Sequence, residues 1–570
     1  MKESDLQKKV AELEAQVRKL KKSNLGLVFE DKTEDVVEQS KVKVPVLKEV
    51  VKNRLELDET YPNNLMIEGD NYLALSVLNY THKKNIDLIY IDPPYNTGAK
   101  NWKYNNDYVD KDDEYRHSKW LSFMRHRLNL AKDLLKDDGF FVCAIDHNEL
   151  FTLGILLDKI FGEENRIGVV TVVHQARGRW MDKNFSASTE FMLVYSKKKG
   201  TNIRNVVIDD LKKEQFNLKD EIGSYYLKDY IVVQGGGGGV TRKDKPTFWY
   251  PIYVKKDLTN VSLEKKAGYE EVLPITKAGR ELTWITIAET FIERYKQGEI
   301  VIKREDGRIV IYRKFREQQI IPTHWIDPKY NATSHGTLLL EKILGKNIFE
   351  YPKSLYLLID ILKLTAGPDA TVLDFFAGSG TTGHAVLELN KEDGGSRKFI
   401  LCTNNENNNG SGTGGIAESV CYPRIKAVIN GYKNKKSEKV AGLPSNLFYY
   451  QTDLVDIEQI HKVPDDAKIR ITYEAGGMIA VREDTLDEVE KNDWWQIFEG
   501  KGKLTAIYFK EDKAKLAELI TKLEKKNFPT ALYIFSWGKN EYKGEYSSAN
   551  IRVEDIPEPI IEVYKEINRI

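Results

Sequence analysis

Cysteine is scarce in this sequence of 570 residues, which contains only Cys143, Cys402 and Cys421. Their spacing matches no metal-ligand pattern, so no metal site is predicted, and so few cysteines favour a reducing compartment over a disulfide-rich fold. No apolar run is long enough to span a membrane, and the N-terminus lacks the apolar core of a signal peptide. These absences predict a soluble, cytoplasmic protein without a membrane partner.

Net charge is also missing, because 86 Lys and Arg residues balance 86 Asp and Glu residues. Any surface that binds nucleic acid must therefore be a local basic patch, since the whole molecule carries no attractive charge. The G-x-x-x-x-G-K-[ST] loop is absent as well, so an ATP-driven translocase is not expected in this chain. The length and the 41% of hydrophobic residues nevertheless allow two to four domains with sizeable cores.

Strand and helix patterns alternate in two separate stretches of the chain. "NLMIEGDNYLALSVLNY" predicts a strand, a turn and a helix, and "IDLIYI" predicts a buried strand; the alternation returns at "TVLDFFAGSGTTGHAVLEL". Such alternation is typical of an α/β fold with a parallel, doubly wound sheet. We therefore predict one α/β domain in two halves, residues 46–174 and 336–440, with an irregular insert at residues 175–335. Residues 1–45 form a helix and connector, and residues 441–570 form a C-terminal α+β module.

The N-terminal stretch repeats hydrophobic residues in steps of four and three. The repeat consists of Leu6, Val10, Leu13, Val17 and Leu20. This spacing is typical of a short coiled coil, which would join two copies of the chain in a homodimer. A helix that packs on its own domain explains the same spacing equally well, because the repeat covers fewer than three or four heptads.

The stretch "LIYIDPPYNTGAKNW" begins as a buried strand and then changes character. Asp92, Pro93, Pro94 and Tyr95 cannot continue the strand, because proline lacks the N–H that a β-ladder needs. The strand must end here in a stiff, polar corner at its carboxyl end, which is where open α/β sheets bind ligands.

The stretch "TVLDFFAGSGTTGHAVLEL" predicts a strand, a glycine turn and a helix that begins near Thr381. Gly378 and Gly380 let the backbone approach a ligand, and the helix N-terminus presents free N–H groups. Glu406 follows the next strand, where an acid can bind a ribose hydroxyl. With Gly383 these glycines also fit G-x-G-x-x-G, so a nicotinamide or flavin site and a purely structural turn remain alternatives.

The two motifs together favour the transfer of a group to a planar amine. An exocyclic amino nitrogen is a poor nucleophile because its lone pair is delocalised into the ring. Asp92 and the Pro93 carbonyl would accept its two N–H bonds and favour a pyramidal nitrogen, while Tyr95 would stack on the base. The prolines would keep this geometry stiff.

"DPPY" followed by "FAGSG" resembles the DNA amino-methyltransferases that use S-adenosylmethionine, in the order of their β class. "EGDNYLAL", "FEYPKS" and the C-terminal module make the chain similar to the Mod subunits of Type III restriction–modification systems. The resemblance implies a circularly permuted Rossmann-like domain, an inserted target-recognition domain, and transfer to adenine N6, since the clamp begins with Asp. It implies cofactor contacts from Asp70, Asp92, Lys353, Asp374, Phe376, Gly378, Gly380, Thr381 and Glu406, with Asn404 or Asn405 as alternatives to Glu406.

Double-stranded DNA is the expected partner, and its target base must be flipped out to reach the cofactor. The insert would read the sequence, and within "HQARGRWMDKNF" the candidates for DNA contacts are Arg177, Arg179, Trp180 and Lys183. A solvated charged loop is an equally good explanation. Restriction would require a separate subunit, and the protein would associate with the prokaryotic nucleoid when bound to DNA. Cytosine N4 methylation and a role chiefly in DNA recognition for a nuclease complex remain alternatives.

Overall fold

The structure is a computed structural model. It describes residues 28–105, 107–175, 185–204, 215–232, 239–316, 321–345, 348–406, 415–434, 437–458, 463–537, 542, 545–546 and 548–568. The predicted coiled coil at Leu6–Leu20 lies outside the described residues, as do the candidate DNA contacts Arg177, Arg179, Trp180 and Lys183.

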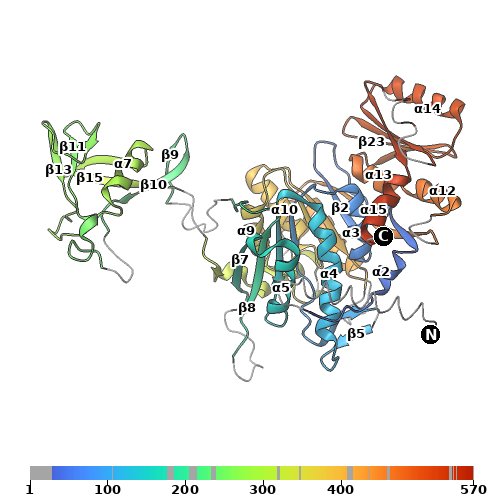
Figure 1. The fold of residues 1–570 in the computed structure, drawn as a ribbon, viewed down its shortest axis with the longest axis horizontal. Helices are drawn as coiled ribbons and strands as arrows, with labels where there is room; N and C mark the ends of the chain where they lie inside the picture. Colours follow the sequence, from blue (N-terminus) through green and yellow to red (C-terminus); the bar gives the residue numbers. More distant parts are fainter. Residues whose placement is uncertain are drawn as a thin grey trace, which may run out of the picture. The chain divides into compact units, whose positions relative to one another are not determined.

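The chain divides into two compact units. The first combines residues 1–204 with residues 322–570, and the second consists of residues 205–321. Figure 1 shows the elements of both units along the chain.

A mixed sheet of ten strands forms the centre of the first unit within the described residues. In spatial order its strands are β1 (Lys43–Glu49), β21 (Asn446–Asp456), β2 (Asn63–Glu68), β18 (Lys398–Thr403), β17 (Thr371–Asp374), β3 (Ile86–Ile91), β6 (Leu135–Ile145), β8 (Thr189–Ser196), β7 (Arg166–Val173) and β16 (His324–Trp325). The six strands from β21 to β6 run parallel, whereas β1, β8 and the β7 end of the sheet introduce antiparallel pairs. Each parallel strand has a buried, largely apolar central stretch, as expected for strands that are covered on both faces.

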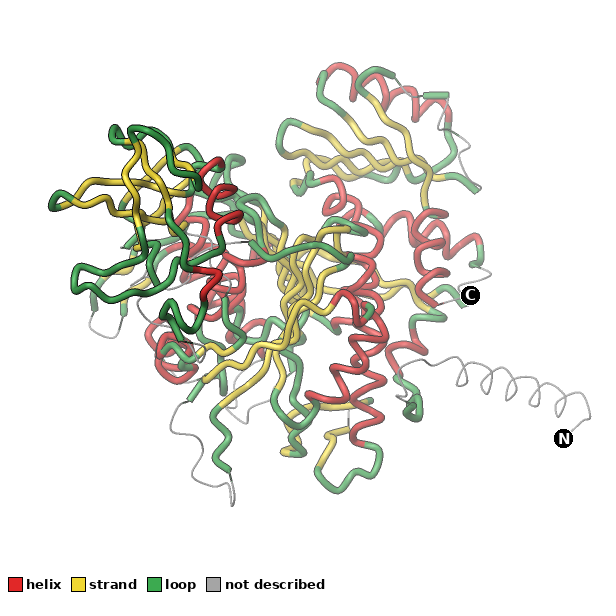
Figure 2. Tube along the Cα trace, turned by 60° about the vertical axis from the view of Figure 1, so that its left-hand side comes forward, coloured by secondary structure: helices red, strands yellow, loops and turns green. Residues whose placement is uncertain are grey.

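Helices cover the sheet in two groups. One group is α3 (Asn71–Thr81), α4 (Arg116–Leu134) and α5 (Leu150–Phe161); the other is α9 (Leu355–Thr365), α10 (Thr381–Asp393) and α11 (Tyr422–Asn430). Neighbours within each group contact each other, and Figure 2 shows helices on both sides of the strands. The predicted strand, turn and helix at residues 63–81 are confirmed, and Asp70 caps α3 by accepting the N–H of Tyr72 at 2.7 Å.

The last part of the first unit holds a second sheet. Its strands are β22 (Asp487–Lys491), β23 (Trp495–Gly500), β24 (Lys503–Tyr508), β25 (Thr530–Phe535) and β26 (Ile551–Ile556). Helix α14 (Lys513–Lys526) begins where Asp512 accepts the N–H groups of Ala514 and Lys515, and its leucines at positions 516, 519 and 523 pack on this sheet. Strand β21, within the range 441–570 assigned to the C-terminal module, lies between β1 and β2 of the large sheet.

The first unit also contains helices and short strands outside the two sheets and the two helix groups. They are α2 (Asp35–Gln39), α8 (Leu338–Leu344), α12 (Asp465–Glu474), α13 (Gly476–Glu483), α15 (Glu558–Asn568) and the short strands β4 (Ala99–Tyr104), β5 (Asp107–Asp110), β19 (Tyr432–Lys433) and β20 (Lys439–Val440). No helix in the described part of the chain has the length and apolar character that a membrane crossing requires.

The described residues of the second unit form small antiparallel sheets and the helix α7. Its elements are β9 (Leu218–Asp220), β10 (Gly223–Asp229), β11 (Ile252–Lys255), β12 (Val261–Ser262), β13 (Tyr269–Val272), α7 (Ala288–Lys296), β14 (Ile300–Glu305) and β15 (Arg308–Arg316). Tyr230, Trp284 and Phe291 form the centre of its core. Strands β8 and β16 fall within the range 175–335 assigned to the insert, yet both belong to the large sheet, because their apolar side chains complete its core.

Candidate active site

The corner after residue 91 and the turn before residue 381 begin at the same edge of the sheet. Strand β3 ends at Ile91 and β17 ends at Asp374, and the two strands are parallel neighbours with Leu373 opposite Ile89. Their carboxyl ends therefore point in one direction. The structure thus brings together the two motifs that lie far apart in the sequence.

Buried hydrogen bonds fix the corner at Asp92–Tyr95. The carbonyl of Pro94 accepts the indole N–H of Trp120 at 2.7 Å. The next residue, Asn96, is fully buried with a φ of +55°, which asparagine tolerates better than most residues. Its side chain donates to the Glu149 carboxylate and accepts the indole N–H of Trp102 at 3.1 Å. The corner is therefore held by buried hydrogen bonds as well as by its two prolines.

Lys353 reaches the corner from the residues just before α9. Its ammonium lies 3.2 Å from Oδ1 of Asp92 and 2.5 Å from Oε2 of Glu190, and it also donates to the hydroxyl of Tyr95. The Tyr95 hydroxyl in turn donates to Glu190 at 3.1 Å. One ammonium thus joins two carboxylates and a phenol in a largely buried group.

Burial and charge oppose each other in this group. Burial raises the pKa of Asp92, and the Lys353 ammonium counteracts only part of that shift. Burial also favours the neutral form of Glu190, but the Lys353 ammonium outweighs it, so the pKa of Glu190 is lowered. For Lys353 the two carboxylates outweigh burial and raise its pKa, so the side chain is a cation at neutral pH.

The glycine turn has a backbone that larger residues could not adopt without strain. Gly378 and Gly380 have φ values of +49° and +75°. A Cβ on Gly378 would lie 3.2 Å from the ring of Phe349, and one on Gly380 would lie 3.1 Å from Sγ of Cys421. The turn therefore requires glycine both for its positive φ values and for the lack of space around each Cα. It leads directly into α10 at Thr381.

Asp374, at the end of β17, holds the glycine turn through two hydrogen bonds. Its carboxylate accepts the N–H of Phe376 at 3.0 Å and the hydroxyl of Thr382 at 2.5 Å. Burial raises the pKa of Asp374 to about 7, despite these two hydrogen bonds. The first turn of α10 is also braced by buried Arg424, which donates to the hydroxyl of Thr381 at 2.8 Å.

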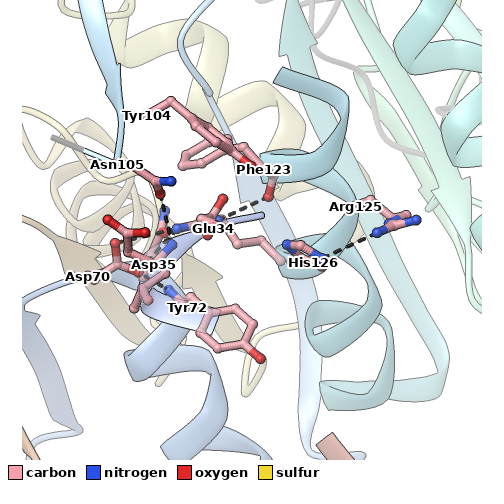
Figure 3. Close-up of polar contacts among 12 residues, drawn as sticks. Glu34, Asp35, Asp70, Tyr72, Tyr104, Asn105, Phe123, Arg125 and His126 are labelled. Carbon is pink, nitrogen blue, oxygen red and sulfur yellow. Dashed lines mark hydrogen bonds and ion pairs between the residues drawn. The ribbon is translucent and has the colours of Figure 1, made fainter. Parts of the chain in front are cut away.

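Asp70 is joined to the glycine turn through a buried arginine. Arg127 of α4 contacts Asp70 at 3.2 Å and Glu34 at 2.7 Å, and it donates to the side chain of Asn71. The Asn71 amide donates to the carbonyl of Phe375 at 2.9 Å, next to Phe376. Figure 3 shows Glu34 and Asp70 close together beside α4. Asp70 thus caps α3 and remains 42% exposed at the sheet edge.

The acid after β18 has a looser environment. The Glu406 carboxylate lies 3.8 Å from the ammonium of Lys103 and is partly exposed. The side-chain oxygen of Asn405 accepts the N–H of Glu418 at 3.1 Å, so it already has a hydrogen-bond partner.

Several residues of this site carry no signal in the sequence. Glu190 and Arg127 are ordinary charged residues within a strand and a helix, and their burial against the motifs depends on the tertiary fold. Asn96 directly follows the "DPPY" corner, which is the one local indication of its role.

A known protein family matches the part of the chain that contains this site. The profile of the DNA methylase family matches residues 86–409, which is more than half of the chain. The chain belongs to the DNA methylase family. The matched range begins at β3 and includes the corner, Glu190, Lys353 and the glycine turn.

Several characterised proteins resemble this DNA methylase over about three fifths of its length. The Type II methyltransferase M.KpnI of Klebsiella pneumoniae is 36% identical over 362 residues, which cover 62% of this chain and 83% of the relative. The Type III restriction–modification enzyme EcoPI Mod subunit of Escherichia phage P1 is 32% identical, and the StyLTI Mod subunit of Salmonella typhimurium is 34% identical. The alignments cover 60% of this chain in both cases, but only 58% and 52% of the two Mod subunits.

Among solved structures, the PvuII DNA methyltransferase (cytosine-N4-specific) matches 60% of this DNA methylase and 82% of its own chain. The sequence identity is 12% and the TM-score is 0.31.

Proposed function

We propose that this DNA methylase transfers a methyl group from S-adenosylmethionine to N6 of a flipped-out adenine in double-stranded DNA. The observation that carries the proposal is the position of the Asp92–Tyr95 corner beside the glycine turn at one edge of a parallel sheet. A site that must bring a planar amine to an electrophile needs these two parts within reach of each other.

The residues at this edge fit S-adenosylmethionine, which supplies an electrophilic methyl group. The glycine turn permits close approach of a ligand to the backbone at Gly378 and Gly380 and leads into the N-terminus of α10 at Thr381. Anionic side chains suit a ligand that carries a sulfonium and an ammonium. The proposed binding residues are Asp70, Asp92, Lys353, Asp374, Phe376, Gly378, Gly380, Thr381 and Glu406.

The chemistry at the corner follows from its acceptors. The Asp92 carboxylate and the Pro93 carbonyl accept the N–H bonds of the amine, which directs the nitrogen lone pair away from the ring, and Tyr95 packs against the base. S-adenosylmethionine, when bound, would supply the methyl group and keep the electron pair of the carbon–sulfur bond on sulfur, and the amine would pass one proton to solvent. Pro94, held by Trp120, keeps the acceptors in place.

Adenine N6 is the preferred target because the corner begins with Asp92 and resembles the adenine-specific members of the family. Cytosine N4 is the second candidate, because both amines are exocyclic and planar. The mass of the methylated nucleoside distinguishes the two.

We further propose that residues 175–335, apart from strands β8 and β16 of the large sheet, form a target-recognition region inserted into a circularly permuted methyltransferase domain. Strand β15 in this region, "RIVIYRKFR", is rich in basic and aromatic residues, which suits contacts with a nucleic acid. Arg177, Arg179, Trp180 and Lys183 are the proposed contacts nearest the flipped base.

The names of the two Mod relatives support a place in a restriction–modification system, with a separate restriction subunit as partner. In this proposal residues 441–570 form the interaction module, and residues 1–45 support a homodimer. A role chiefly in DNA recognition is the alternative, and it predicts that DNA binding and partner binding persist after Asp92→Ala.

The test is methylation of unmodified DNA. The protein is incubated with unmethylated plasmid DNA and S-adenosylmethionine labelled in its methyl group, and the nucleosides are separated by mass spectrometry. We expect label in N6-methyladenine. Label in N4-methylcytosine would replace the adenine assignment, and label in RNA or protein only would overturn the proposed substrate.

A further inference from the structure

Glu190 is a buried carboxylate at the proposed site that belongs to neither motif. It lies on β8, which pairs with β6 on the side of the sheet beyond β3, and its side chain is only 7% exposed. A buried carboxylate is costly unless it is paired, and Glu190 is paired with Lys353 at 2.5 Å and with the Tyr95 hydroxyl at 3.1 Å. Lys353 contacts Asp92, and Tyr95 is the last residue of the corner.

The contacts of Lys353 explain why a second carboxylate is present. An ammonium has three N–H bonds, and Asp92, Glu190 and Tyr95 provide three acceptors for them. The distance to Glu190 is 2.5 Å and the distance to Asp92 is 3.2 Å, so the ammonium is held more closely by Glu190. Asp92 thus has a neighbouring cation that another carboxylate shares.

We infer that Glu190 is a positioning residue for methyl transfer. By holding the Lys353 ammonium more closely than Asp92 does, Glu190 leaves the Asp92 carboxylate able to accept a hydrogen bond from the target amine. This inference rests on the proposed function, because it concerns the acceptor that the amine would meet.

Loss of the Lys353 charge and loss of the Glu190 charge should affect Asp92 in opposite ways, and electrostatics explains both effects. Without Lys353, two carboxylates would face each other in a buried site, so Asp92 would take up a proton at a higher pH. Without the charge of Glu190, the ammonium would pair with Asp92 alone and compete with the target amine for the same oxygen. Either change weakens the acceptor, but for a different reason.

Among the described residues, the other groups that act on Asp92 do not include a second cation. The titratable groups that act on it and its neighbours come from the corner itself, β3, β6, β8, β17, the residues before α9 and the end of β7. They are Tyr95, Tyr90, Cys143, Glu190, Asp374, Lys353 and His174, and His174 acts on Glu190. Lys353 is the one lysine or arginine in this set, so it is the cation that opposes the effect of burial on Asp92.

Four proteins test the inference: the wild type, Lys353→Met, Glu190→Gln and the double variant. The turnover number is measured from pH 5.5 to 9 with labelled S-adenosylmethionine and DNA at saturating concentrations. We expect the acid limb of the profile to move up by about 1 pH unit or more in Lys353→Met. In Glu190→Gln it should move down, with a maximal rate about tenfold or more below the wild type. The double variant should lie between the two single variants.

A purely structural role of Glu190 gives a different result. The rate would then fall in Glu190→Gln without a shift of the acid limb, and the double variant would have the same acid limb as Lys353→Met; either result overturns the inference. If Glu190→Gln alone does not fold, the comparison of Lys353→Met with the double variant decides, because a neutral pair is tolerated better than an unpaired buried charge. Thermal unfolding and calorimetry with S-adenosylmethionine monitor folding and cofactor binding. A wild type that labels no DNA at any pH contradicts the proposed function instead.

Discussion

Leu373 of β17 lies opposite Ile89 of β3 on an adjacent parallel strand. Because both strands end within two residues of this pair, the residues that follow them emerge together at the carboxyl edge of the sheet. Asp92 and the glycine turn therefore share one site, and four predictions follow from how that site is built.

Replacement of Asp92 by alanine removes the carboxylate that would accept the amine. We expect methylation to fall by about 10²- to 10³-fold, the usual effect of losing one hydrogen-bond partner of a transition state. Transfer of labelled methyl groups to DNA measures this loss. Asp137→Ala is the control, because Asp137 is exposed and its ion pair with Lys198 lies at the surface; a comparable loss in both variants would show a non-specific effect.

Replacement of Gly378 by alanine combines a strained backbone with a close contact. The φ of +49° and the Phe349 ring at 3.2 Å from the new Cβ should displace the glycine turn. We expect the affinity for S-adenosylmethionine to fall at least tenfold in calorimetry. Gly394→Ala shares the strain, with φ +71°, but has open space around the new Cβ, so it should lower stability without changing that affinity. Equal affinities in both variants would contradict a role of the turn in cofactor binding.

Replacement of Arg127 by methionine leaves the buried carboxylate of Glu34 without its cation. Such a change typically destabilises a protein by about 3–5 kcal/mol, and burial already raises the pKa of Glu34. Thermal unfolding should show the loss, and Arg127→Met/Glu34→Gln should recover part of it. Arg470→Met, at an exposed ion pair, is the control and should have little effect.

The raised pKa of Asp374 predicts how stability depends on pH. The ordinary value is 3.8 and the folded value is about 7, so between these values the folded state holds a proton that the unfolded state releases. The contribution of Asp374 to stability therefore falls as pH rises from about 4 to about 7. Asp374→Asn removes this dependence, so its melting temperature should rise relative to the wild type as pH increases. A difference that stays constant with pH would contradict the shifted pKa.

The sequence predicted the elements that depend on local patterns. The strand at residues 86–91 has a continuous apolar run, and two prolines end it; the glycine turn is fixed by backbone conformations that only glycine adopts easily. The predicted helix start near Thr381 agrees with α10. These features are encoded within a few residues of each other, so a single sequence reveals them.

The residue ranges predicted for the insert and the C-terminal module differ from the sheet for a physical reason. The apolar pattern of β8 and the two residues of β16 do not say which sheet they join, and β21 lies in the range 441–570 although it pairs with β2. Which strand pairs with which depends on how the complete strands pack in the folded protein, and a short local pattern does not contain that information.

The conformations of the corner and the glycine turn follow from local sequence, because rigid prolines and unrestricted glycines act through their own backbone. The charges that surround them depend on the tertiary fold. Glu190, Lys353 and Asp92 come from three distant segments, and their pKa values depend on burial and on separations of a few ångströms. Charge interactions in a site of low dielectric are set by distance, and the linear sequence does not contain distances between remote residues.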